Sequence, residues 1–270
     1  MMKTELYQVD SFTTEPFKGN PAGVCLLEQP ASESWMQNLA MEMNLAETAF
    51  IYPESDGFRL RWFTPITEVE LCGHATLATA HILFETGKLK PNETARFYTK
   101  SGILTVKKND DFLEMIFPAT PASQCPEPEN LSRALGNVNF LYCGKNDFDY
   151  LVELDSEDVI KSLKPDFELL KQITTRGIIV TSRSRSLEFD FVSRFFAPSL
   201  GIDEDPVTGS AHCTLGPYWV KKLSKSKFVA YQASSRGGIV QVELKGDRVL
   251  LRGRAVTIFS ASLTDKVRNK

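Results

Sequence analysis

Hydrophobic residues in this chain follow two periods, and each period occurs in both halves of the sequence. In GFRLRWFT (57–64), apolar residues at every second position alternate with arginines, which predicts a strand with one buried face. The segment HATLATAHILFET (74–86) is apolar on nearly every side, which predicts a fully buried helix. A second apolar helix is expected from about 210 to 222. The chain therefore mixes strands with two central helices.

The remaining segments predict a strand-rich α+β protein. Ser32 is expected to cap a helix that runs to about 43, with Trp35, Leu39 and Met43 on its buried face. Further strands are expected near 5–10, 22–27, 47–53, 94–100, 102–107 and 112–117, and again near 138–143, 149–154, 177–182, 188–197, 227–232, 238–243 and 248–252. Each half thus predicts a strongly bent sheet wrapped around one buried helix.

The two halves repeat each other at a nearly constant offset. LCGHATLA (71–78) corresponds to PVTGSAHC (206–213), so that Gly73 and Gly209 are 136 positions apart. SGILTV (101–106) and GGIVQV (237–242) are separated by the same 136 positions. A shared offset across a glycine turn, a helix and a strand indicates a duplicated unit.

The repeat also predicts the domain boundaries. Residues 1–117 form the first domain, and residues 129–254 form the second. Between them, residues 118–128 carry four prolines, which indicates a linker. AVTIFSASL (255–263) has no counterpart in the first half, and we expect it to cross back and complete the first sheet.

Composition and charge exclude several classes of protein. A net charge of −3, with acids and bases well mixed, leaves no basic stripe for a nucleic acid. No signal sequence and no membrane-spanning run is evident. Five scattered cysteines without a CxxC pair predict free thiols in the cytoplasm. No metal-ligand spacing, dinucleotide fingerprint or P-loop is found, so that we expect neither a metal nor a cofactor.

The two glycine turns carry the candidate chemistry. Gly73 and Gly209 each precede a buried helix, whose first amides and dipole attract an anion. Glycine lets a ligand approach the backbone, and Ser210 adds a hydroxyl. Two such turns facing one cleft would hold a substrate carboxylate from both sides and draw the domains together. The alternative is that each is only a tight turn into a core helix.

Three side chains are candidates for proton transfer. His74 lies at the first turn, where we expect the helix N-terminus to lower its pKa and keep it neutral. Asp205, held extended by Pro206, is expected to face His74 across the cleft, with Glu204 as its neighbour. Glu47 lies among apolar residues at the start of a strand, where burial would raise its pKa. The alternatives are an exposed strand-edge carboxylate for Glu47 and a solvated acidic loop around Asp205.

The other two histidines are weaker candidates. His81 lies two turns into the apolar helix, and we expect it to be a core histidine. His212 follows Ser210 by two residues and could lie in the core or behind the site.

Four ordered blocks resemble the phenazine-biosynthesis-like (PhzF-type) proteins of the diaminopimelate epimerase-like superfamily. These blocks are GNPAGV (19–24), MNLAETAFI (43–51), FTPITEVELCGHATLATAH (63–81) and FAPSLGIDEDPVTGSAH (196–212). The resemblance implies two similar domains with the site between them, and a homodimer. It implies cofactor-independent isomerisation, as of the cyclic trans-2,3-dihydro-3-hydroxyanthranilate, in which a glutamate moves a proton between carbons.

Matched block by block, the resemblance assigns that glutamate to Glu47, with His74, Asp205 and Ser210 as helpers and the amides of Gly73 and Gly209 near the substrate carboxylate. Racemases of the superfamily instead use two thiols, one at each glycine turn.

Cys72 stands at the first of these positions, but Thr208 stands at the second and cannot act as a thiolate-like base. The sequence therefore predicts a cofactor-free isomerase of a small, cyclic carboxylate. A single-carbon epimerase and a non-catalytic small-molecule binding protein remain as alternatives.

Overall fold

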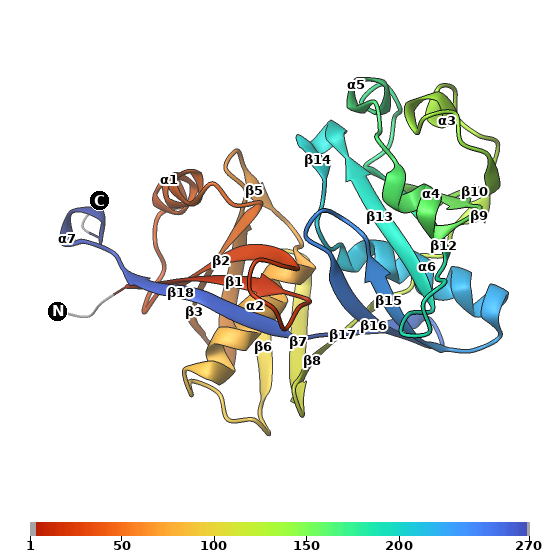
Figure 1. Ribbon diagram of the computed structural model, residues 1–270. Coiled ribbons are helices and arrows are strands. Elements are labelled where there is room, and N and C mark those ends of the chain that lie inside the picture. Colours follow the sequence, from red (N-terminus) through yellow and green to blue (C-terminus); the bar gives the residue numbers. More distant parts are fainter. Residues whose placement is uncertain (1–3, 269–270) are drawn as a thin grey trace. The chain divides into compact units, whose positions relative to one another are not determined.

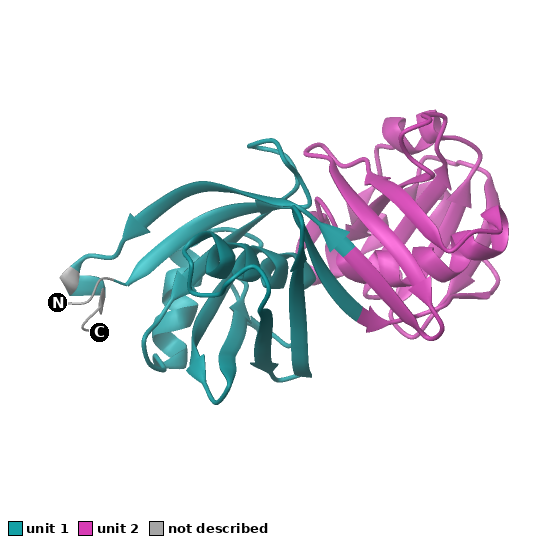
Figure 2. Cartoon of the chain, turned by 90° about the horizontal axis from the view of Figure 1, so that it is seen from below, with its two compact units in different colours: residues 1–116, 252–270 teal, residues 117–251 magenta. Residues whose placement is uncertain are grey.

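The computed structural model describes residues 4–268 and divides into two compact units (Figures 1 and 2). Unit 1 comprises Met1–Ile116 and Arg252–Lys270, and unit 2 comprises Phe117–Leu251. Both are α+β. Among the described residues, no helix is long and apolar enough to cross a membrane.

The sheet of unit 1 runs in the order β18-β1-β2-β3-β4-β6-β7-β8. Neighbours are antiparallel except for β2 with β3 and β4 with β6, which are parallel. The short strand β5 pairs with β4. The strands are β1 (Glu5–Ser11), β2 (Asn20–Leu26), β3 (Glu47–Glu54), β4 (Gly57–Phe63), β5 (Glu68–Val69), β6 (Thr94–Thr99), β7 (Gly102–Asn109), β8 (Phe112–Pro118) and β18 (Ala255–Ser262).

The sheet of unit 2 repeats this plan in the order β9-β10-β11-β12-β13-β15-β16. The parallel pairs recur as β11 with β12 and β13 with β15, and β14 pairs with β13 as β5 does with β4. The duplicated α+β architecture is therefore confirmed. The strands are β9 (Ser123–Gln124), β10 (Phe140–Lys145), β11 (Asp149–Leu154), β12 (Gly177–Arg183), β13 (Phe191–Ala197), β14 (Ile202–Glu204), β15 (Lys227–Gln232), β16 (Gly238–Lys245) and β17 (Arg248–Gly253).

In each sheet, one edge strand comes from the segment that follows the last long strand of the other sheet. β18, which follows the last strand of unit 2, pairs antiparallel with β1 from Glu5↔Ser262 to Ser11↔Ala255. β9, which follows β8, pairs antiparallel with β10 in the same position of the second sheet. The segment 118–128, expected to be a linker, thus lies within unit 2, where Thr120 N–H donates to the carbonyl of Cys213.

One buried helix packs on each sheet, as the apolar runs predict. Helix α2 (Gly73–Glu85) contacts β1, β2, β3 and β18, and α6 (Gly209–Leu223) contacts β16. The shorter elements are α1 (Glu33–Met43), α3 (Leu131–Ala134), α4 (Glu157–Ser162), α5 (Phe167–Leu170), η1 (Pro198–Leu200) and α7 (Asp265–Arg268).

Helix α1 begins at the expected cap, because Ser32 Oγ accepts a hydrogen bond from the amide of Trp35. Its buried face differs from the expectation. Met36, Leu39 and Ala40 are buried, whereas Trp35 and Met43 are only half-buried. The indole of Trp35 instead donates to the carbonyl of Val267, which draws the ring toward the edge of the core.

Replacing Gly177 with alanine should destabilise unit 2. A Cβ at Gly177 would lie 2.2 Å from the ring of Phe195, which is buried and has little freedom to move. We expect a loss of about 1–3 kcal/mol, typical of overpacking. Gly209→Ala is the control, because its Cβ would make only ordinary contact at 3.6 Å with Leu251. Urea unfolding of the two variants measures the difference, and equal stabilities would contradict the packing argument.

Candidate active site

The start of three elements in unit 1 brings an acid and a base together. Glu47 is the first residue of β3, Asn20 is the first of β2, and His74 lies in the first turn of α2. Because β2 and β3 are parallel, their first residues lie at the same end of the sheet. Glu47 Oε2 is 3.2 Å from His74 Nε2, with both side chains mostly buried. The structure thus joins two of the candidate residues.

The contact between these two groups is close but poorly aligned. Glu47 Oε2 is buried and has no hydrogen bond of good geometry among the described residues, although it meets the distance of an ion pair. The attraction is therefore mainly electrostatic. An oxygen held this way keeps a lone pair that is not committed to a fixed donor.

The other ring nitrogen and the backbone of His74 are also held. Asn20 Nδ2 lies 3.1 Å from His74 Nδ1, and Ser11 Oγ donates to the carbonyl of His74 at 2.8 Å. Cys72 Sγ lies 3.5 Å from the same Nδ1. With its amide in this orientation, Asn20 donates to Nδ1 and directs the ring proton of a neutral His74 to Nε2. The turned amide would instead accept from an imidazolium. Asn20 stands in the GNPAGV block, but sequence reasoning gave it no role, because only the fold places it beside His74.

The pKa of His74 is raised well above its usual value, contrary to the expected lowering. Burial acts to lower it, but the negative charges of a Cys72 thiolate and of Glu47 outweigh burial. The Cys72 thiol itself has a raised pKa, first through burial and then through Glu47. The thiol is therefore protonated near pH 7, which leaves Glu47 as the neighbouring group whose contact still raises the pKa of His74. The expected lowering of the His74 pKa took only the helix dipole into account, because the contacts with Cys72 and Glu47 are made by the fold.

The first turn of α2 has the features of an anion site. The cap residue Cys72 makes no capping hydrogen bond through its side chain. A Cβ built at Gly73 would meet no atom within 4 Å, so that the glycine faces open space. Free amides and the positive end of a helix dipole favour a carboxylate here.

Unit 2 holds the equivalent turn without the acid–base pair. Thr208, Gly209 and Ser210 take the places of Cys72, Gly73 and His74 in the repeat. Thr48 of β3 pairs with Phe63, and Ile178 of β12 pairs with Phe196 in the same way. The residues that precede Thr48 and Ile178 therefore correspond, so that Gly177 of unit 2 stands where unit 1 has Glu47. A single unit therefore supplies the carboxylate and the imidazole.

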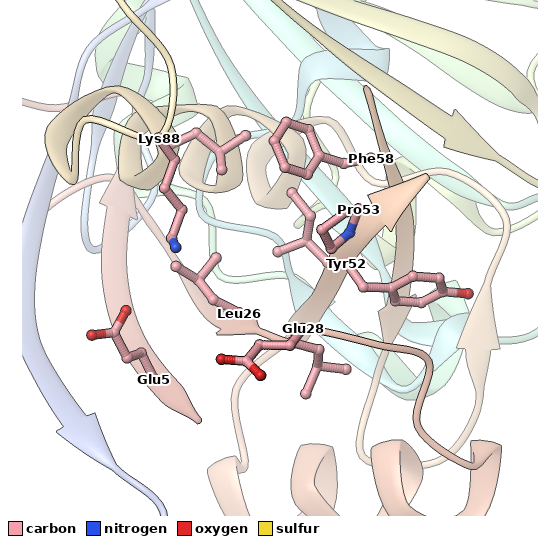
Figure 3. Close-up of a pocket in the computed structure, with 10 residues that line it drawn as sticks. Glu5, Leu26, Glu28, Tyr52, Pro53, Phe58 and Lys88 are labelled. Atoms are coloured by element: carbon pink, nitrogen blue, oxygen red, sulfur yellow. The ribbon is translucent and has the colours of Figure 1, made fainter. Parts of the chain in front are cut away.

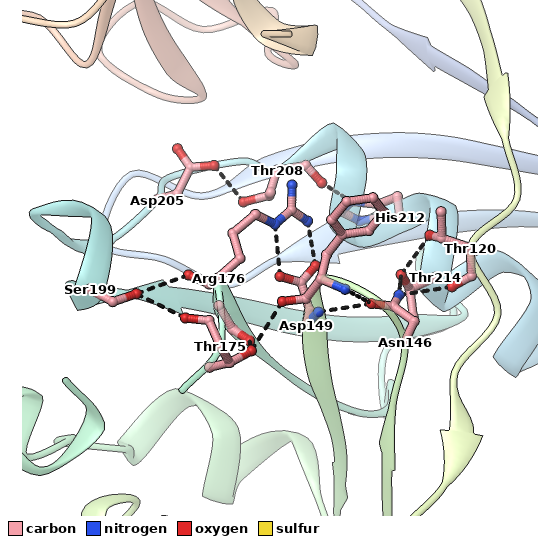
Figure 4. A network of polar contacts seen from close by, with 12 residues as sticks. Thr120, Asn146, Asp149, Thr175, Arg176, Ser199, Asp205, Thr208, His212 and Thr214 are labelled. Carbon is pink, nitrogen blue, oxygen red and sulfur yellow. Dashed lines mark hydrogen bonds and ion pairs between the residues drawn. The ribbon is translucent and has the colours of Figure 1, made fainter. Parts of the chain in front are cut away.

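Asp205 belongs to a hydrogen-bonded cluster at the turn of unit 2 (Figure 4). Its Oδ2 accepts from Thr208 Oγ1 at 2.5 Å, and its carbonyl accepts from Gln232 Nε2 at 2.8 Å. Gln232 Oε1 in turn accepts from the amide of Thr208 at 2.8 Å. These contacts fix the DPVTGS loop ahead of Ser210, which is half-buried.

Other candidate residues serve the fold. Glu204 forms a two-pronged ion pair with Arg194, at 2.6 and 2.8 Å. His212 is fully buried, with Nδ1 2.8 Å from the carbonyl of Thr208, and burial lowers its pKa to about 4. His81 Nε2 lies 3.1 Å from Thr257 Oγ1. His212 is therefore a core histidine, whereas His81, expected in the core, is only half-buried and also lies 3.7 Å from Glu85 Oε1.

A pocket of about 110 Å³ lies at the other end of unit 1 (Figure 3). Its lining comes from the ends of β2, β3 and α2, at Leu26, Tyr52 and Leu83 among others, whereas Glu47 and His74 lie at the starts of their elements. The charged residues that line it are Glu5, Glu28 and Lys88. The close contact between Glu47 and His74 thus lies away from this pocket.

The cluster of Glu47, Cys72 and His74 contains the ligand types of a metal site, which the spacing of these residues in the sequence did not predict. Ligand atoms of Glu47, Cys72 and His74 lie within 4.8 Å of one another. Sulfur, nitrogen and oxygen donors suit Zn²⁺. Binding would require His74 to lose a proton and Cys72 to become a thiolate, which the raised pKa values of both groups oppose.

The pKa of His74 should fall when Glu47 loses its charge. In the wild-type protein, the imidazolium should persist above pH 6.5, and in Glu47→Gln the titration should move down because burial is then opposed by less negative charge. NMR titration of the histidine ring protons measures this shift. His212, whose pKa is about 4, is the internal control and should not move. An unchanged His74 titration would contradict the assignment.

The same shift gives a pH dependence of stability. Because the pKa of His74 is higher in the folded state than in the unfolded state, protonation of His74 adds to the free energy of unfolding. This contribution to stability is complete below pH 6.5 and is lost as pH rises through the folded-state pKa of His74. His212 acts in another window, because its lowered pKa makes stability fall as pH falls from 6.5 toward 4.

Comparison with known proteins gives one consistent result. Residues 9–261 match the family model described as phenazine biosynthesis-like protein. An uncharacterized isomerase of Halalkalibacterium halodurans is 56% identical over 264 residues, covering 97% of this chain and 99% of that protein. A PhzF-family protein of Enterococcus faecalis has a crystal structure with a TM-score of 0.93 and 42% identity, over 97% of this chain and 100% of the other. A predicted epimerase of Pseudomonas aeruginosa, 20% identical over 96% of this chain and 99% of its own, shares the fold with a TM-score of 0.73.

Proposed function

Because the chain belongs to the phenazine biosynthesis-like family and is an isomerase, we propose that Glu47 moves a proton between two carbons of a small carboxylate substrate. The observation that carries this proposal is the buried contact of 3.2 Å between Glu47 Oε2 and His74 Nε2, next to the open turn at Gly73. The proposed reaction needs no cofactor, because one carboxylate can take a proton from carbon and return it to another.

The roles follow from the environment of each group. Glu47 has an uncommitted lone pair in a mostly buried place, which suits a general base that later acts as an acid. His74, whose pKa is raised by its contacts with Cys72 and Glu47 despite burial, is proposed to stabilise the negative charge that develops on the substrate when the carbon loses its proton. Asn20 orients the imidazole through Nδ1.

The substrate carboxylate is proposed to bind the amides that begin α2, where Gly73 leaves room for it. Asp205, Gly209 and Ser210 of unit 2 are included in the proposal on the strength of the family blocks that contain them. The substrate is proposed to be cyclic, since a ring holds the two carbons within reach of one carboxylate.

Two arguments disfavour the thiol mechanism of a racemase. Cys72 has a pKa raised by burial and by Glu47, so that little thiolate forms near neutral pH. The second turn offers Thr208, whose hydroxyl already donates to Asp205. A single-carbon epimerase with two thiols would need a cysteine there.

Glu47→Gln should abolish turnover while leaving the fold intact. The amide keeps the shape of the side chain but cannot take a proton. The matched control is Glu54→Gln, the same change at the other end of β3, where the carboxylate pairs with Arg59. The measurement is deuterium uptake from heavy water into cyclic amino and hydroxy acids, starting with trans-2,3-dihydro-3-hydroxyanthranilate, followed by NMR.

The position of the label separates the alternatives. An isomerase places deuterium at a different carbon from the one that lost its proton, and an epimerase places it at the same carbon with inversion. Binding without any exchange would identify a non-catalytic binding protein. Near wild-type exchange in Glu47→Gln would refute the proposed base.

Gly73→Val should weaken substrate binding more than stability. The space beside Gly73 is open, so that the protein can accept the side chain, but a ligand approaching the amides cannot. We expect KM to rise by about tenfold or more, equivalent to the loss of about 1.4 kcal/mol or more of binding, with Tm nearly unchanged. An unchanged KM would place the carboxylate elsewhere.

Activity should survive a chelator and fall with added zinc. The proposed base must be free to accept a proton, and Zn²⁺ held by Glu47, Cys72 and His74 would occupy it. Cys72→Ser should reduce zinc inhibition while retaining turnover. Loss of activity on chelation, restored by a metal, would contradict the proposed reaction.

A further inference from the structure

Two of the five cysteines lie directly opposite each other on neighbouring strands. β9 pairs with β10 in the register Gln124↔Gly144 and Ser123↔Lys145, which places Cys125 opposite Cys143. The amide of Cys125 donates to the carbonyl of Cys143 at 3.1 Å, so that the pairing extends to the cysteines. Cα atoms of opposite residues in an antiparallel pair are about 4.5–5.5 Å apart, within the range that a disulfide spans.

The side chains of this pair also interact. Opposite residues project to the same face of a sheet. The pKa of Cys143 is raised to about 12 by burial and then by the charge and the side-chain hydrogen bond of Cys125. The two sulfur atoms are therefore close enough to interact electrostatically and to form a hydrogen bond. Both are free and half-buried, whereas Cys25, Cys72 and Cys213 are buried.

We propose that Cys125 and Cys143 form a reversible disulfide when the protein meets a small-molecule disulfide. The sulfur of Cys125 loses its proton and attacks one sulfur of the oxidant, whose S–S bond breaks and releases one thiolate. Cys143 then loses its proton and attacks the Cys125 sulfur, which releases the second thiolate. Two protein thiols become one disulfide, and one oxidant disulfide becomes two thiols.

The contacts support this order of events. Two of the causes that raise the pKa of Cys143 come from Cys125, and both disappear once the Cys125 sulfur is part of a mixed disulfide, which has neither a charge nor an S–H group. The second attack then takes place between neighbours, without a search through conformations.

The bond would fasten a segment that the backbone holds weakly. β9 has only two residues, and Pro121, Pro126 and Pro128 beside it carry no amide donor. The segment nevertheless anchors the chain where it enters unit 2, through a hydrogen bond of 2.9 Å between the hydroxyl groups of Thr120 and Thr214 (Figure 4). A disulfide would join this edge covalently to β10 and restrict the unfolded chain.

The experiment is oxidation of the full-length reduced protein with glutathione disulfide, followed by alkylation and peptide mapping by mass spectrometry. We expect the protein to lose two hydrogen atoms and to yield one cross-linked peptide pair containing Cys125 and Cys143. Tm should rise by roughly 5 °C in the oxidised form and return on reduction.

Cys125→Ser and Cys143→Ser should each abolish the cross-link and the rise in Tm, and Cys25→Ala, which changes a buried thiol, should leave both unchanged. A stable glutathione adduct on Cys125 with Cys143 still free would overturn the proposal, as would a cross-link between chains or to any other cysteine. Turnover does not enter this readout, so that a failure here is distinct from a failure of the proposed function.

Discussion

The buried pair of Glu47 and His74 is the constraint on which the site depends. Removing either charge from water is costly, and each partner offsets the cost for the other only while the two stay in contact. Three elements must begin at the same edge of the sheet to keep that contact: β2 at Asn20, β3 at Glu47 and α2 beside His74. The parallel pairing of β2 with β3 and the packing of α2 against both strands meet this requirement. The geometry of the sheet and its helix is therefore also what holds the acid and the base together.

Duplication supplied the scaffold twice, but the chemistry has diverged. Both sheets have the same sequence of parallel and antiparallel neighbours, and both helices begin at a glycine turn. Where unit 1 has Glu47, unit 2 has Gly177, and the ring of Phe195 fills the space that a side chain would need. Unit 2 keeps hydroxyl groups at its turn, at Thr208 and Ser210, in place of the thiol and the imidazole. Hydroxyl groups can bind a substrate but cannot readily act as bases near neutral pH.

Hydrophobic periodicity predicted the long elements well, because each spans several residues with one buried face. The buried helix 74–86 and the strand 57–64 are found as α2 and β4. The two- and three-residue strands β5, β9 and β14 were missed, since a segment that short shows no period. The sequence named Glu47 and His74 as candidates, and the structure brings them into contact, but the sequence did not predict the contact of Asn20 with His74 or the raised pKa of His74. Those properties arise from residues 27 and 54 positions away that only the fold brings into contact.

One turn of the fold cannot support carboxylate and thiolate chemistry at the same time. Glu47 raises the pKa of Cys72, because two negative charges in one buried place repel each other. Converting this chain to a two-thiol epimerase would therefore require removal of Glu47 as well as a cysteine at Thr208. The lack of a thiol at Thr208 and the presence of the Glu47 carboxylate are chemically consistent with each other. Because the second turn has no thiol to act with Cys72, the acid–base contact that the two turns offer is that of Glu47 with His74.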